Sequence, residues 1–210
     1  MRIGELGRSS GIAVPTIKYY LREGLLHRGD ATAPNQANYD ATHVRRLRLI
    51  RVLTEIGRLS LGAVKEVLRA IADDRLPVHQ MIGVAQYALG PPPDAAEPAD
   101  DVRLAREEVD TFLRRLRWRV SPDAPGRRAL ADALVALRGH EHDVGAEVFD
   151  HYADVASELA SYELDRTDVS GRRSAAVENV IVGTVVYEAA FNALRRLAHE
   201  DHSARRRRTT

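Results

Sequence analysis

The chain has 210 residues, of which 44% are hydrophobic and 29% charged, and its formal net charge at pH 7 is +1. That total argues against a surface coated with positive charge for nucleic acid, but the charges are unevenly placed along the chain. Residues 1–70 hold 12 basic and 6 acidic side chains (net +6), whereas residues 71–204 hold 15 and 24 (net −9). The arginines at 205–208 add +4. A basic front and an acidic rear indicate two modules with different partners.

The hydropathy and composition of the chain exclude several classes of protein and of site. No run of about 18 apolar residues exists, so we expect no transmembrane helix and no membrane partner. The first residues lack the apolar core of a secretory signal, and we expect the cytosol as the location. Cysteine is absent, which excludes disulfides, thiolate metal sites and a cysteine nucleophile. No catalytic residue, cofactor or bound metal is predicted, and the chain is not expected to be an enzyme.

The first 70 residues predict a closed unit of two helices, a two-stranded wing and two more helices. A tight glycine-containing turn at residues 10–11 joins the first two helices into a helix-turn-helix. The polar loop over residues 28–37 is typical of a wing rather than of a helix. We expect Thr42 and Ser60 to cap the third and fourth helices. Apolar spacing places the four helices at residues 3–9, 14–23, 42–56 and 61–71.

In the rest of the chain, apolar residues recur at the spacing of an α-helix. The predicted fold class is therefore mainly α: a winged helix-turn-helix followed by an all-α helical bundle. The last predicted helix is the most apolar, which fits two packed neighbours or a dimer interface. The predicted helices cover residues 78–89, 100–118, 121–139, 143–163 and 173–203. We divide the chain into a DNA-binding domain (1–75), a short helix with a Pro-rich linker (76–99), an effector-binding or dimerisation domain (100–204) and a basic, disordered tail (205–210).

A series of motifs in the front third resembles the DNA-binding domain of the MerR family of bacterial transcription regulators. They lie in order and at the family's spacing: Ile3-Gly4-Glu5-Leu6, Thr16-Ile17-Lys18-Tyr19-Tyr20, Arg22-Glu23-Gly24-Leu25-Leu26, Tyr39, Val44-Arg45-Arg46-Leu47-Arg48-Leu49-Ile50 and Gly57-Arg58-Leu59-Ser60-Leu61. The resemblance implies a homodimer that binds pseudo-palindromic, double-stranded promoter DNA and distorts its spacer so that RNA polymerase engages.

The candidate DNA contacts lie on the second helix and at the end of the wing. The early turns of that helix enter the major groove in a helix-turn-helix, where Thr16 and Lys18 can reach base edges or phosphates. Tyr19 offers a hydroxyl to phosphate, although both it and Tyr20 could instead pack in the core. The full set is Pro15, Thr16, Lys18, Tyr19, Arg22, Asn38 and Tyr39. Residues 35–37 replace the Gly-Tyr-Arg that is common in the family, so Arg28 or Asn38 would have to supply the wing contact.

The rear half resembles, loosely, the terminal helix of TetR-type ligand-binding domains. Such a bundle can hold a small apolar effector between its helices, and the aromatic residues are the candidates for lining that pocket. These residues are Trp118, Tyr152, Tyr162 and Phe191, with ordinary core packing as the alternative for each. Dimerisation could use the helix at 78–89, the helix at 100–118 or the bundle.

A group of histidine and acidic side chains in the rear half fits either a metal site or an ordinary solvated helix face. The side chains concerned are His140, Glu141, His142, Asp143, Glu147 and His151. They lack a partner motif at metal-ligand spacing, so the solvated face is preferred. The alternative functions are a ligand-independent autoregulator, a nucleoid-associated DNA-binding protein and, least favoured, an enzyme acting on a small molecule.

Overall fold

Two structural units divide the chain, and the C-terminal helix belongs with the N-terminal residues. The computed structural model describes residues 1–33, 36–73, 75, 78–90, 98–140, 144–166 and 173–207. The head unit comprises Met1–Ala85 and Val169–Thr210, and the helical unit comprises Gln86–Asp168. The predicted domain of residues 100–204 therefore differs from the observed division, because its last helix packs on the head unit.

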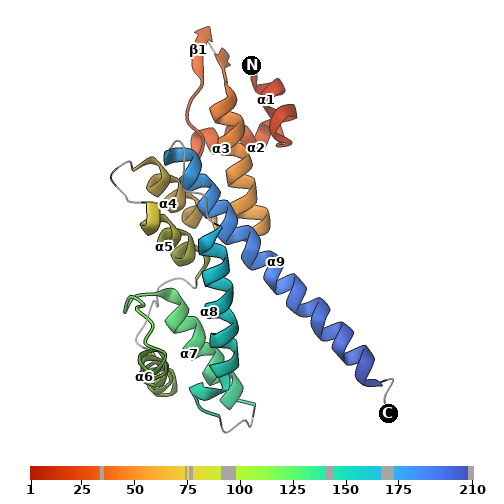
Figure 1. Ribbon diagram of the computed structural model, residues 1–210. Helices are drawn as coiled ribbons and strands as arrows, with labels where there is room; N and C mark the ends of the chain where they lie inside the picture. Colours follow the sequence, from red (N-terminus) through yellow and green to blue (C-terminus); the bar gives the residue numbers. More distant parts are fainter. Residues whose placement is uncertain are drawn as a thin grey trace. The chain divides into compact units, whose positions relative to one another are not determined.

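The head unit contains the predicted helix-turn-helix and wing (Figure 1). In chain order its elements are α1 (Ile3–Ser10), α2 (Val14–Arg22), β1 (Asp30–Ala33), β2 (Gln36–Asn38), α3 (Ala41–Arg51), the π-helical turn η1 (Val52–Ile56), α4 (Leu61–Ala72) and α9 (Arg173–Arg207). Helix α5 (Val78–Leu89) spans the boundary between the two units. The mainly α fold with a small two-stranded wing is thus confirmed.

A small apolar core holds α1, α2, the wing and α3 together. Its fully buried members include Leu6, Ile17 and Leu47, each with 0% of its surface exposed. The turn between α1 and α2 depends on Gly11, whose φ of 72° is left-handed and suits a residue without a Cβ. The period-3.6 spacing of the apolar residues therefore sets which face of each helix is buried.

Helix α3 begins one residue earlier than predicted, because Asp40 is its N-cap. The Asp40 carboxylate accepts hydrogen bonds from the backbone N–H groups of Thr42 (2.9 Å) and His43 (3.3 Å). Hydrogen bonds from the side chains of Thr42 and then His43 lower the pKa of Asp40. The predicted cap at Thr42 was wrong, since a carboxylate two residues upstream outcompetes it. Ser60 does cap α4, accepting from the Ala63 N–H at 3.2 Å.

The first turns of α9 close the head unit against η1 and α4. One stripe of α9 is buried there: Ala176, Val177, Val180, Ile181 and Val185. The contact is closest at Gly57, where an added Cβ would lie 2.8 Å from the Leu53 carbonyl oxygen and 2.8 Å from Val185 Cγ1. A residue without a side chain is what permits this approach.

The far end of α9 extends through Arg207, so the first arginines of the expected disordered tail are helical. Arg205 Nε donates to Asp201 Oδ1 at 3.0 Å, one turn earlier in the helix. Arg208 and the two terminal threonines lie outside the described residues. No helix among the residues that the structure describes is long and apolar enough to cross a membrane.

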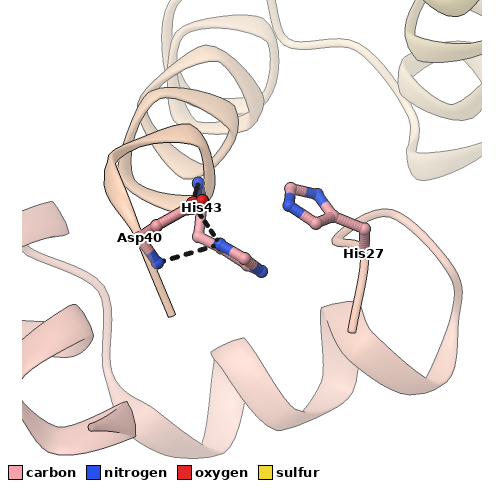
Figure 2. A group of neighbouring side chains, drawn as sticks. All are labelled: His27, Asp40 and His43. Atoms are coloured by element: carbon pink, nitrogen blue, oxygen red, sulfur yellow. Dashed lines mark hydrogen bonds and ion pairs between the residues drawn. The ribbon is translucent and has the colours of Figure 1, made fainter. Parts of the chain in front are cut away.

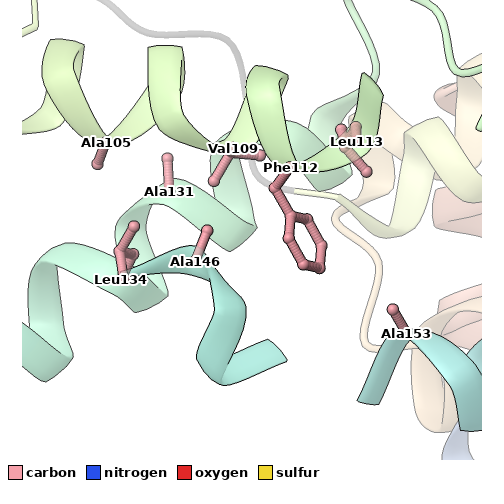
Figure 3. Close-up of a cluster of buried hydrophobic side chains, with 8 residues drawn as sticks. All are labelled: Ala105, Val109, Phe112, Leu113, Ala131, Leu134, Ala146 and Ala153. Carbon is pink, nitrogen blue, oxygen red and sulfur yellow. The ribbon is translucent and has the colours of Figure 1, made fainter. Parts of the chain in front are cut away.

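The helical unit is built on the pairing of α6 (Asp100–Arg115) with α7 (Pro125–Arg138), followed by the 3-10 turn η2 (Ala146–Phe149) and α8 (Asp150–Asp165). Figure 3 shows the buried side chains of α6 and α7 facing one another. The predicted helix at 143–163 starts later and begins with a 3-10 turn, because Gly145 is extended (φ −95°, ψ −179°) before η2 and the α-helix itself begins at Asp150. Residues 91–97, the greater part of the predicted Pro-rich linker, lie outside the described residues.

Glu108 joins three parts of the helical unit. Its carboxylate accepts from Arg138 Nη2 on α7 at 2.6 Å and from the backbone N–H of Ala146 in η2 at 2.6 Å. These hydrogen bonds, the one from Arg138 foremost, lower the pKa of Glu108 below its ordinary 4.5. Ion pairs of Asp110 with Arg127 and of Asp150 with Arg115 add further links.

The packing at Gly57 generates the first prediction. Gly57→Ala is expected to lower the free energy of unfolding by about 1–3 kcal/mol, because its methyl group has to displace η1 or α9. The control is Gly62→Ala on the exposed start of α4, where the new Cβ has only Ser60 Oγ nearby at 3.7 Å. That variant is expected to be neutral or slightly stabilising. Urea unfolding followed by circular dichroism measures both, and equal effects would contradict the contact.

The second prediction concerns the pH dependence of the helical unit. Because the folded pKa of Glu108 is depressed, its stabilisation is present above pH 4.5 and is lost as pH falls through the folded pKa. Glu108→Gln is therefore expected to cost about 1 kcal/mol at pH 7, given partial solvent screening, and much less at pH 3.5.

Glu107→Gln is the control, because the Glu107 carboxylate pairs with Arg103 on an exposed helix surface. Urea midpoints at the two pH values give the comparison. A Glu108→Gln deficit that persists unchanged at pH 3.5 would show that charge is not its cause.

Candidate nucleic-acid interface

Helix α2 has one buried face and one exposed face, and the predicted DNA contacts lie on the exposed one. Pro15, Lys18 and Arg22 are exposed, and 36% of the Tyr19 surface is accessible. On the opposite side Ile17 is fully buried. Thr16 is half-buried at the edge. The spacing i, i+3, i+4 and i+7 therefore aligns two cations and a tyrosine along one stripe of the helix.

The two adjacent tyrosines of α2 have different environments. Tyr20 packs against the core of the head unit, and burial, with smaller contributions from Glu55 and Tyr19, raises its pKa. Its ring centroid lies 6.0 Å from that of Tyr19, which faces outward. Core packing is thus the role of Tyr20, and Tyr19 remains available on the surface.

The wing is a short antiparallel pair that is tied to the N-terminus. Asp30 pairs with Asn38 and Ala31 with Ala37, and the register shifts before Ala33. Arg2 Nη1 donates to Thr32 Oγ1 at 2.8 Å, which links the start of α1 to β1. Asn38 is exposed at the end of β2 and can reach a ligand. Asn35, the first of the three residues that replace the family's usual Gly-Tyr-Arg, lies outside the described residues.

Tyr39, which the sequence predicts as a DNA contact, lies in the core of the head unit. Only 9% of its surface is exposed, and it belongs to the core of the head unit. Its backbone pairs with Met1, with the Tyr39 N–H donating to the Met1 carbonyl at 2.9 Å and the N-terminal amine donating back at 2.7 Å. A Cβ on Gly29 would lie 3.0 Å from the Tyr39 ring. Tyr39 positions the wing rather than presenting its ring on the surface.

An acidic residue from α9 lies against the basic α3, a contact that sequence reasoning missed. Glu178 Oε2 is 3.9 Å from Arg45 Nε, and burial raises the pKa of Glu178 while Arg45 and Arg46 oppose that rise. Arg46 Nε in turn donates to the Leu25 carbonyl, just after α2, at 3.0 Å. Since more than 130 residues separate Glu178 from its partners, no local sequence signal could have indicated this contact.

The four predicted effector-pocket residues are not gathered into one core. Trp118, Tyr152 and Tyr162 belong to the helical unit and expose 38%, 56% and 54% of their surfaces. Phe191 belongs to the head unit and is 39% exposed. None of these four side chains is buried in the core of the single chain, so ordinary core packing does not explain them. The effector pocket itself stays a prediction.

Three of the six metal candidates of the rear half lie outside the described residues: Glu141, His142 and Asp143. A different cluster in the head unit brings together His27, Asp40 and His43, shown in Figure 2. Burial, followed by the charges of His43 and Arg46, lowers the pKa of His27, so its imidazole is neutral at pH 7.

Comparisons with known proteins agree with this arrangement. The model of a family described as "MerR HTH family regulatory protein" matches residues 1–71. The mercuric resistance operon regulatory protein of Serratia marcescens is 31% identical over 109 residues, covering 52% of this chain and 70% of that protein. The nodulation protein NolA of Bradyrhizobium elkanii is 36% identical over 67 residues, so the match spans 32% of this chain and only 30% of that relative.

A solved structure extends the similarity over nearly the whole chain. The crystal structure of SCO5550, a proposed transcriptional regulator from Streptomyces coelicolor A3(2), superposes with a TM-score of 0.68 at 37% identity. The match covers 98% of this chain and 97% of that one. Fold and exposed helix together define a winged helix-turn-helix regulator of transcription that binds DNA. The chain belongs to the MerR HTH family.

Proposed function

We propose that the protein is a homodimeric regulator that recognises specific double-stranded promoter DNA through α2 and the wing. The observation that carries the proposal is the exposed stripe of α2, where Lys18, Tyr19 and Arg22 lie opposite the buried Ile17. A helix held by its apolar face can insert its other face into a major groove. Family and relatives indicate a regulator of transcription rather than an enzyme.

The roles of the contacts follow from their chemistry. Lys18 and Arg22 neutralise phosphates or bond to guanine, and Thr16 and Tyr19 donate hydroxyl hydrogens to phosphate or bases. At the wing, the exposed Arg28 and Asn38 take the place of the family's usual arginine. Pro15 lies in the first turn of the helix and approaches the backbone of the DNA. RNA polymerase at the same promoter, in the cytosol, is the proposed partner whose access the dimer controls.

The second half of α9 is proposed as the surface that pairs with a second copy of the chain. All its residues from Ala190 to Arg206 are exposed, including large apolar side chains. Tyr187, Phe191 and Leu194 recur at i, i+4 and i+7, the spacing of a coiled-coil seam, and 57%, 39% and 63% of their surfaces are accessible. A contiguous apolar face of this kind on a helix calls for a protein partner.

The helical unit is the proposed site of a small-molecule effector. Trp118, Tyr152 and Tyr162 present accessible aromatic surface there, which suits an apolar or planar ligand. Native mass spectrometry of the purified protein tests this directly. A retained small molecule supports the sensor, whereas ligand-free protein with full regulatory activity supports an autoregulator.

The third prediction tests the role of α2 in binding DNA. Lys18→Ala is expected to weaken binding to the preferred DNA sequence by about 1–3 kcal/mol and to reduce the salt slope by about one unit, as a lost phosphate or guanine contact requires. The preferred sequence comes from in vitro selection, and fluorescence anisotropy over a salt series measures the affinity.

The control for Lys18 is the only other lysine of the chain, Lys65 on α4. Lys65→Ala removes the same charge away from α2 and is expected to leave affinity and slope unchanged. If both variants behave alike, net charge rather than the α2 surface governs binding.

The fourth prediction tests dimerisation through α9. Leu194→Glu is expected to shift the protein from a species of twice the 23.3 kDa chain mass towards the monomer, because the new charges would be buried in the seam. Asn192→Glu adds the same charge on the opposite side of the helix and is expected to leave the dimer intact. Analytical ultracentrifugation at several concentrations gives the dissociation constants. Dimers of equal strength in both variants would place the interface elsewhere.

A further inference from the structure

Two histidines and an aspartate meet at the base of the wing, on either side of it in sequence. His27 lies between α2 and β1, Asp40 caps α3, and His43 lies in the first turn of that helix. One potential ligand atom from each of the three lies within 4.8 Å of the other two. Figure 2 shows His27 facing the imidazole of His43 across the cluster.

The ring of His43 is held in a defined orientation by Asp40. His43 Nδ1 is 2.7 Å from Asp40 Oδ1, and only 5% of the residue's surface is exposed. The Asp40 backbone N–H also lies 3.1 Å from Nδ1, in the geometry of a capping box. Two lone pairs only 2.7 Å apart would repel each other, so the carboxylate keeps the proton on Nδ1 and leaves a lone pair on Nε2. Histidines that bind metals are oriented in the same way, with the second nitrogen donating to a carboxylate.

The Nε2 atom of His43 is buried and has no hydrogen-bond partner among the described residues. Leaving a buried polar atom unpaired is unfavourable, so such an atom indicates a missing ligand. Capping of α3 accounts for the contact between Asp40 and His43. It does not account for the unpaired Nε2, nor for the stacking of His27, whose ring centroid lies 3.8 Å from that of His43 and whose Nε2 lies 3.2 Å from Thr42 Oγ1.

We infer that His27 and His43 bind a divalent transition-metal ion of the zinc class, with Asp40 orienting the imidazole of His43. Asp40 is a positioning residue because its Oδ1 already accepts from the Thr42 and His43 N–H groups. Neutral imidazoles suit zinc and its neighbours better than magnesium or calcium. With no cysteine in the chain, the ligands are nitrogen and oxygen atoms only.

The ion would tie together the two ends of the wing. His27 precedes β1 by three residues, and Asp40 follows β2 by two. Joining them through a metal restrains the wing against α3 and stabilises the head unit by mass action. This site does not depend on the proposed DNA-binding function, and its test uses no DNA.

The experiment titrates the full-length, untagged protein with Zn²⁺ by calorimetry and with Co²⁺ by visible absorption. The expected result is one ion per chain and a higher thermal midpoint of unfolding. His27→Ala, at an exposed position that the fold tolerates, is expected to weaken binding at least about tenfold. Asp40→Asn keeps an N-cap residue and is expected to weaken binding by about 10–100-fold.

The matched control is His151→Ala, which removes an exposed histidine of α8 in the helical unit. It is expected to leave affinity and stoichiometry unchanged. Nitrogen-15 spectra of the imidazoles provide an independent readout, since Zn²⁺ should shift Nε2 of His43. Equal affinities for His27→Ala and His151→Ala, or no saturable binding below millimolar Zn²⁺, would overturn the inference.

Discussion

The structure depends on the burial of one stripe of α9 against η1 and against α4. Val177, Ile181 and Val185 are almost wholly buried there, and Gly57 allows the backbones to approach. Because these side chains come from the far end of the sequence, the head unit is not complete within the first third of the chain. The winged helix-turn-helix and the C-terminal helix are parts of one structural unit.

This packing also connects α9 with the helix proposed to read DNA. Glu178 of α9 faces Arg45 and Arg46 of α3, and Arg46 holds the carbonyl of Leu25 just beyond α2. The opposed charges of the chain therefore meet inside the head unit. A partner that covers the exposed half of α9 would act on a helix that is itself packed against η1 and α4.

Local signals in the sequence predicted most of the individual elements. The bounds of α5 agree with the prediction, and those of α1, α2 and α4 agree to within a residue or so, since apolar periodicity and glycine breaks act over a few neighbours. The exposed stripe of α2 followed from the same periodicity. Errors arose where two residues compete to cap a helix, as at Thr42, or where an extended glycine delays the start of a helix, as at Gly145.

The sequence by itself determined the family, the mainly α fold and the exposed chemistry of α2, because these reside in motifs and periods of a few residues. Only the tertiary structure decided that α9 joins the head unit, that Tyr39 is buried, and that His27 lies beside Asp40 and His43. The physical reason is that the free energy of burying apolar side chains depends on their area and shape, and not on how far apart they lie in the sequence. Contacts between distant residues are therefore specified by the packing of the whole unit.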